Sequence, residues 1–72
     1  MKILIVDDEI FVRMGIKSTY DWSKYGFEIV GEAEDGLEAI DMFTRFRPDI
    51  VLVDVRMPRM DGLDFIKKVK DI

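Results

Sequence analysis

The chain has 72 residues, of which 49% are hydrophobic, enough for one small folded domain and too many for a disordered tail. Its formal net charge of −4 argues against nucleic-acid binding by this segment itself. The absence of Cys and His excludes disulfides and argues against a zinc site, and no apolar stretch approaches the roughly 20 residues of a membrane span. We therefore expect a soluble cytoplasmic protein.

Two short apolar runs, each followed by acidic residues, stand out along the chain. Residues 2–6 contain Ile-Leu-Ile-Val and residues 50–54 contain Ile-Val-Leu-Val, a pattern typical of parallel strands that are buried on both faces. Residues 27–33 form a further predicted strand, in which Glu28 and Glu32 are interleaved with apolar residues. Interleaved charges of this kind favour an edge strand.

The first predicted helix follows the first strand and ends at about residues 19–20. Asp7 and Asp8 open this helix, and Glu9 lies in its first turn, where the helix dipole favours negative charge. A glycine inside a helix costs about 1 kcal/mol relative to Ala. We therefore expect Gly15 to have a packing role, namely to let the helix approach the sheet closely.

Two more helices are predicted after the second and third strands. The second starts at Asp35, a favourable N-cap with Glu38 three residues on, and ends near Phe46, before Pro48. The third begins near residues 61–63, after a predicted loop. Helical spacing places the following residues on the core faces of these two helices: Leu37, Ile40, Phe43, Leu63, Ile66 and Val69.

The element order βαβαβα indicates parallel strands joined by right-handed crossovers. If the first and third strands are neighbours, Asp7, Asp8 and Asp54 converge at the carboxyl edge of the sheet, where open α/β sheets bind ligands. Carboxylates that share a site repel one another, and a hard cation such as Mg2+ relieves the repulsion. The pattern predicts a metal-assisted acidic pocket with Asp54 as a possible nucleophile. The alternative is that Asp7 and Asp8 only cap a helix and Asp54 only starts a turn.

Four ordered blocks of the sequence agree with a known family. They are ILIVDDE at residues 3–9, AEDGLEA at 33–39, PDIVLVDVRMP at 48–58 and MDGL at 60–63. Together they resemble the receiver domain of two-component response regulators, and they cover nearly the whole chain. The resemblance implies that residues 1–72 are a truncated flavodoxin-like (CheY-like) α/β domain, βαβαβα with parallel strand order 2-1-3, lacking the last two of five βα units.

The same resemblance implies roles for particular residues. Asp54 would accept a phosphoryl group from a histidine kinase. Asp8 and Asp54 would ligate Mg2+ through their side chains, and the backbone carbonyl of Arg56 would be a third protein ligand. Asp7 would bind the metal through water or support Asp8. The chain would thus be a phosphoacceptor module and not an enzyme in its own right.

The sequence departs from the family pattern in its extent. In intact receivers the fourth strand ends in a Thr or Ser hydroxyl, and the fifth ends in a Lys, and both contact the phosphoryl group. Neither unit is present in these 72 residues, so we expect this chain alone to be inactive in switching. The connector at residues 21–26, Asp-Trp-Ser-Lys-Tyr-Gly, resembles receivers that are coupled to AraC-type DNA-binding output domains, so we expect the parent protein to bind DNA through such a domain.

Two alternative functions remain open from the sequence. The chain could be an assembly unit that forms a homodimer through the exposed edge of its third strand, without chemistry. It could also be a phosphatase that forms an aspartyl-phosphate. Such enzymes generally carry a second acid two residues after the nucleophile, and here that position is Arg56, which argues against the phosphatase.

Overall fold

A computed structural model of the chain describes residues 1–54 and 62–70. Within them, a parallel sheet of three strands has the order β2-β1-β3, as the sequence predicted. The predicted loop before the third helix lies largely outside the described residues. The elements are β1 (Lys2–Val6), α1 (Ile10–Thr19), the 3-10 helix η1 (Trp22–Tyr25), β2 (Glu28–Ala33), α2 (Gly36–Phe46), β3 (Ile50–Val53) and α3 (Gly62–Val69).

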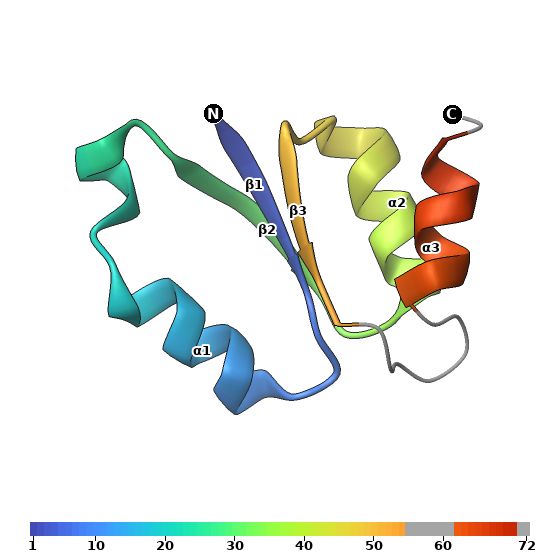
Figure 1. Ribbon diagram of the computed structural model, residues 1–72, viewed down its shortest axis with the longest axis horizontal. Helices are drawn as coiled ribbons and strands as arrows, with labels where there is room; N and C mark the ends of the chain where they lie inside the picture. The colour runs from blue at the N-terminus through green and yellow to red at the C-terminus, as the bar shows by residue number, and fades with distance from the viewer. Residues whose placement is uncertain (55–61, 71–72) are drawn as a thin grey trace.

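The helices cover the two faces of the sheet unequally (Figure 1). Helices α2 and α3 lie side by side on one face, whereas α1 and η1 lie on the other. The central strand, β1, is buried on both faces from Ile3 to Val6. This explains why its sequence is a continuous apolar run and does not alternate with polar residues. None of the described helices is long and apolar enough to cross a membrane.

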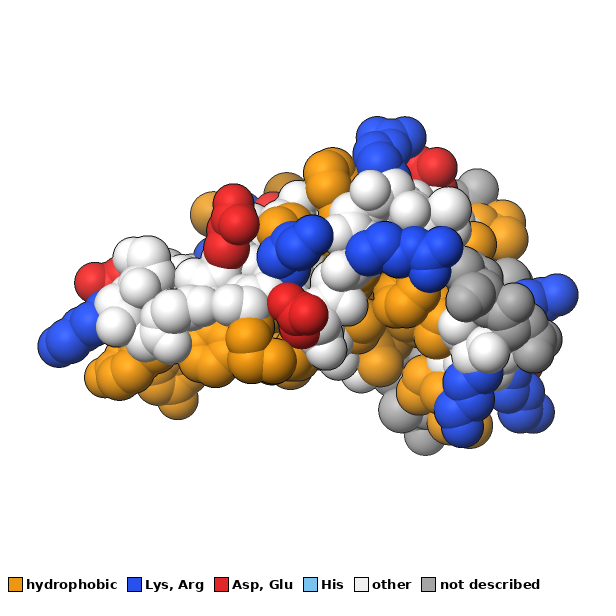
Figure 2. All heavy atoms as spheres, turned by 90° about the horizontal axis from the view of Figure 1, so that it is seen from above, with side chains coloured by type: hydrophobic (Ala, Val, Ile, Leu, Met, Phe, Trp, Pro, Cys, Tyr) orange, Lys and Arg blue, Asp and Glu red, His pale blue; other side chains and the backbone are white. Residues whose placement is uncertain are grey.

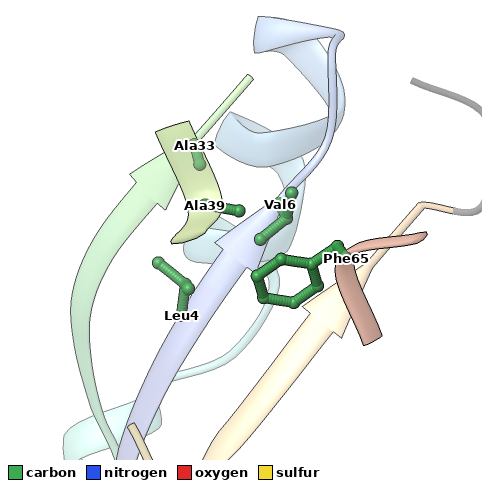
Figure 3. Close-up of a cluster of buried hydrophobic side chains, with 5 residues drawn as sticks. All are labelled: Leu4, Val6, Ala33, Ala39 and Phe65. Carbon is green, nitrogen blue, oxygen red and sulfur yellow. The ribbon is translucent and has the colours of Figure 1, made fainter. Parts of the chain in front are cut away.

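The hydrophobic core lies between the sheet and the pair α2 and α3 (Figure 3). Leu4 and Val6 point from β1 toward this face because alternate residues of a strand share a face. The ring of Phe65 on α3 meets that of Phe43 on α2 edge to face, with 6.3 Å between ring centroids. The buried members of the cluster are Leu4, Val6, Ala33, Ala39 and Phe65.

The predicted core faces of α2 and α3 are partly wrong. Leu37 is 49% exposed and Leu63 is 56% exposed, and Ile66 is exposed as well. Ile40, Phe43 and Val69 do pack against the core as partly buried residues. The fully buried residues of the two helices are Gly36, Ala39, Gly62 and Phe65. The reason is that α2 packs on α3 as well as on the sheet, and Phe65 of α3 joins the cluster of Leu4 and Val6, so neighbouring elements decide which side chains are covered.

Helix α1 also differs from the prediction. It begins at Ile10 with Glu9 at the N-cap position, so Asp7 and Asp8 precede the helix. None of its residues is buried, and Phe11 is 82% exposed. A Cβ added to Gly15 would meet no atom within 4 Å. The expected close approach of this helix to the sheet at Gly15 is therefore wrong.

Candidate functional site

The carboxyl ends of β1 and β3 bring three acidic side chains together. Val6 and Val53 are paired across the two strands, and the Asp54 amide donates to the Val6 carbonyl oxygen at 2.9 Å. The segment after β1 therefore leaves the sheet beside Asp54, at the lower end of the strands in Figure 1. Carboxylate oxygens of Asp7, Asp8 and Asp54 lie within 4.8 Å of one another. The structure thus places the three predicted site residues in one cluster.

The turn between β1 and α1 is fixed by hydrogen bonds at Asp7. Its amide donates to the Ala33 carbonyl oxygen on β2 at 3.0 Å. Its Oδ1 accepts from the Glu9 amide at 2.9 Å, as Asp side chains commonly do two residues along the chain. This hydrogen bond closes a turn ahead of α1, whose N-cap is Glu9 without a side-chain cap, so Asp7 is not the helix cap of the alternative interpretation. Asp8 is exposed, whereas Asp7 and Asp54 are half-buried.

A cavity of about 310 Å³ adjoins the acidic cluster. Two of the three acids, Asp7 and Asp54, line it together with apolar residues. The lining residues come from β1, β3, α1 and the strand ends: Ile5, Val6, Asp7, Ile16, Leu52, Val53 and Asp54.

The chemistry of this cluster fits Mg2+. Three carboxylates offer hard oxygen ligands without nitrogen or sulfur, and two of them, Asp7 and Asp54, belong to half-buried residues. Mg2+ prefers one or two carboxylates together with water or phosphate oxygens. Arg56, whose carbonyl was expected as another ligand, lies outside the described residues.

A second acidic cluster has a structural explanation. Glu34, Asp35 and Glu38 also bring carboxylate oxygens within 4.8 Å of one another. Asp35 is buried, and its Oδ1 accepts from the Glu38 amide at 2.8 Å. Asp35 is thus the N-cap of α2, as the sequence predicted. This cluster belongs to the start of a helix.

Sequence reasoning missed an ionic network beside the site. Glu32 on β2 accepts from Arg13 Nε at 3.0 Å and from Lys17 Nζ at 2.6 Å. The hydrogen bond from Lys17, together with Arg13, holds the pKa of Glu32 below its usual value. Arg13 Nη1 also donates to the Asp7 carbonyl oxygen at 2.5 Å. The only signal in the sequence was Glu32 itself, a charge within a largely apolar strand.

Comparison with known proteins places this geometry in a family. The profile of the response regulator receiver domain matches residues 3–72. The chemotaxis protein CheY of Bacillus subtilis is 46% identical over 71 residues, which are 99% of this chain and 58% of that protein. An uncharacterized response regulatory protein of Staphylococcus epidermidis is 39% identical over 71 residues, but they amount to only 28% of its length.

Solved structures show the same fold. The REC domain of AraT, a response regulator from Geobacillus stearothermophilus, superposes with a TM-score of 0.92 at 46% identity, over 97% of this chain and 54% of that one. A two-component transcriptional regulator AraC from Clostridium phytofermentans gives a TM-score of 0.89 at 38% identity, over 99% of this chain and 57% of that one. The chain therefore spans little more than half of these domains. By family profile, sequence and fold, it belongs to the response regulator receiver domain family.

Proposed function

We propose that this chain is the phosphoacceptor part of a receiver domain, in which Asp54 takes a phosphoryl group from a histidine kinase. The observation that carries the proposal is the cluster of Asp7, Asp8 and Asp54 beside an open cavity at the carboxyl edge of the sheet. An acid that ends a buried strand is costly unless it is paired or used. Membership of the receiver family supports the same role.

The transfer is a displacement at phosphorus. A carboxylate oxygen of Asp54 attacks the phosphorus atom of a phosphohistidine, and a P–O bond forms as the P–N bond breaks. The electron pair of the broken bond stays on the imidazole nitrogen, and Asp54 becomes an acyl phosphate. Little covalent work falls to the protein, so its contribution is positioning and charge stabilisation. The hydrogen bond from the Asp54 amide to β1 fixes the position of this residue.

The remaining acids would hold the metal. Asp8 and Asp54 would bind Mg2+ through their side chains, together with the Arg56 carbonyl. Asp7 would act through water or by supporting Asp8, since its Oδ1 already accepts from the Glu9 amide. Bound Mg2+ would neutralise part of the charge that gathers on the transferred phosphoryl group.

A metal titration tests the site directly. We expect Mg2+ at millimolar concentrations to shift the amide signals around Asp8 and Asp54, and the response to be lost in Asp8→Ala. Glu34→Ala is the matched control, because it removes one exposed carboxylate from the other acidic cluster. A response that is equal in all three proteins, or none at tens of millimolar Mg2+, would contradict the proposed metal site.

Phosphorylation is the second test. A phosphoryl group brings about −1.5 to −2 charge to a site with two further acids, and the resemblance places the compensating Lys in a unit that these 72 residues do not contain. We therefore expect a small phosphodonor with Mg2+ to modify the chain alone poorly and a five-unit receiver well. Intact-mass measurement decides, with Asp54→Asn as the control. An unchanged yield in Asp54→Asn would refute the role of Asp54.

Two partner assignments complete the proposal. The similarity to a two-component transcriptional regulator AraC supports a parent protein that binds DNA through a separate output domain. The 72-residue chain on its own would form a homodimer through β3, the outer strand of the described sheet on that side.

A further inference from the structure

Helix α1 carries a side chain that contacts the backbone of the acidic site. Arg13 is on the first turns of this helix, and its side chain is only 12% exposed. Its Nη1 donates to the carbonyl oxygen of Asp7, six residues earlier. Its Nε donates to Glu32 on β2 at 3.0 Å. One guanidinium group therefore ties the β1–α1 turn to the neighbouring strand.

Hydrogen bonds at Asp7 support the turn between β1 and α1. No residue of α1 is fully buried, and only Arg13 and Ile16 are half-buried. Three hydrogen bonds at Asp7 therefore help to set the direction in which the chain leaves β1: its amide to Ala33, its Oδ1 to the Glu9 amide, and its carbonyl to Arg13. The Arg13 contact is the one among these three that a side chain outside the turn supplies.

We infer that Arg13 is a positioning residue for the acidic site, holding the Asp7 carbonyl against β2 through Glu32 so that Asp7 and Asp8 face Asp54. The inference rests on the proposed metal site. The planar guanidinium can make both contacts at once, whereas a Lys ammonium is a single point charge at the end of a flexible stem.

The direction in which Mg2+ affinity changes when Arg13 is replaced distinguishes a positioning role from a purely electrostatic one. The positive charge of Arg13 repels Mg2+, so the loss of this charge alone would tighten Mg2+ binding. The loss of positioning would weaken it, and removal of a group that supports a metal ligand typically costs 10- to 100-fold in affinity. We expect Arg13→Gln to bind Mg2+ about tenfold more weakly. Arg13→Lys, which keeps the charge, should also bind more weakly than the wild type.

Lys17→Gln is the matched control. Lys17 binds the same Glu32 and carries the same charge, but no contact with Asp7 joins it to the turn in the described structure. Its loss should leave Mg2+ affinity within about twofold of wild type or slightly tighter, as expected for the loss of a partly exposed charge. Titrations are made on the full chain well below its unfolding temperature, with urea midpoints measured in parallel so that a loss of folding is recognised.

Hydrogen exchange measured without Mg2+ tests the positioning role of Arg13 separately from the proposed metal site. In Arg13→Gln, hydrogen exchange at the Glu9 amide should accelerate several-fold relative to amides of β1, and in Lys17→Gln it should not. If the wild type binds no Mg2+, the proposed metal site fails, and the exchange data still decide the positioning role. Unchanged exchange at Glu9 in Arg13→Gln, or Mg2+ binding as tight as that of wild type in this variant, would overturn the inference.

Discussion

At the scale of single residues, Glu32 shows how a charge in an edge strand becomes structural. Arg13 and Lys17, which are both on helix α1, form ion pairs with the Glu32 carboxylate. Their contacts lower its pKa, chiefly through the hydrogen bond from Lys17. In the unfolded chain these partners separate, and the pKa returns to its ordinary value. Protonation of Glu32 is therefore linked to unfolding.

The stability of the protein should accordingly depend on Glu32 in a defined pH window. Since its pKa is lower in the folded state, the stabilisation is complete above the ordinary Glu pKa and is lost as pH falls through the folded value. Glu32→Gln should cost about 0.5–1 kcal/mol at pH 7, the range for partly exposed ion pairs, and have little effect at pH 3. Urea unfolding at both pH values measures this.

Glu28→Gln is the control for this experiment. Glu28 is an exposed residue at the start of the same strand, so its neutralisation should change stability by less than about 0.5 kcal/mol at either pH. Equal effects of the two substitutions, or a Glu32→Gln effect that persists at pH 3, would show that the ion pairs contribute no net stability.

The acidic cluster and the ionic network differ in how far the sequence predicts them. Asp7 and Asp8 follow one apolar run and Asp54 follows another, and such strand ends meet when the two parallel strands are neighbours, which the family resemblance implied. The partners of Glu32 lie 19 and 15 residues before it. Their contact depends on how α1 crosses the sheet face, and no local pattern reports that. The Arg13 contact with Asp7 was missed for the same reason.

At the scale of elements, the start of α2 is fixed locally. Asp35 is buried and caps the helix through the Glu38 amide at 2.8 Å. Asp35→Ala should destabilise the protein by about 1–2 kcal/mol, the cost of losing an N-cap. The urea midpoint measures the loss. Asp41→Ala removes an exposed pair with Arg45 within the same helix and should cost less than about 0.5 kcal/mol. Similar losses in both variants would argue against a specific cap.

Two substitutions on α3 test which face of this helix is buried. Phe65 is in the core and contacts Phe43, whereas Leu63 is exposed. Phe65→Ala should cost about 3–5 kcal/mol, or unfold so small a domain, since this is the usual cost of truncating a buried Phe. Leu63→Ala should cost less than about 1 kcal/mol. Comparable losses in the two variants would instead favour the apolar stripe through Leu63 that the sequence suggested.

Helices α2 and α3 show which features of a helix can be predicted from its sequence pattern. A cap such as Asp35 acts over three residues, so the sequence contains all of its geometry. The core face of a helix depends on what surrounds it. On α3 two apolar pairs have helical spacing, Leu63 with Ile66 and Phe65 with Val69, and they lie on different faces. The pair with Phe65 is the one that packs against the core and Phe43. The existence of the helices was therefore predictable, whereas their orientation about their own axes was predicted only in part, at Ile40, Phe43 and Val69.

At the scale of the whole molecule, the two faces of the sheet are unequal. The face beneath α2 and α3 holds the hydrophobic core, while the other face carries α1 and the cavity lined by Ile5 and Leu52. Figure 2 shows hydrophobic side chains exposed along the part of the molecule where η1 lies, and Lys and Arg side chains over α2 and α3. A domain of 72 residues with this much exposed apolar surface has little stability to spare.

The last prediction concerns association of the 72-residue chain. Among the described strands, β3 pairs with β1 on one side only, and Leu52 in it is 36% exposed and lines the cavity. An apolar strand edge invites pairing with another chain, and a two-fold dimer is the commonest closed solution. Sedimentation equilibrium should therefore show dimers at high micromolar concentration. Leu52→Lys should shift them toward monomer, because a charge at the strand edge opposes pairing.

Leu63→Lys is the control for this experiment. It places the same charge at an exposed apolar position on α3 and should leave the dimer intact. A well-folded monomer of the wild-type chain, or equal dissociation by the two substitutions, would rule out β3 as the interface.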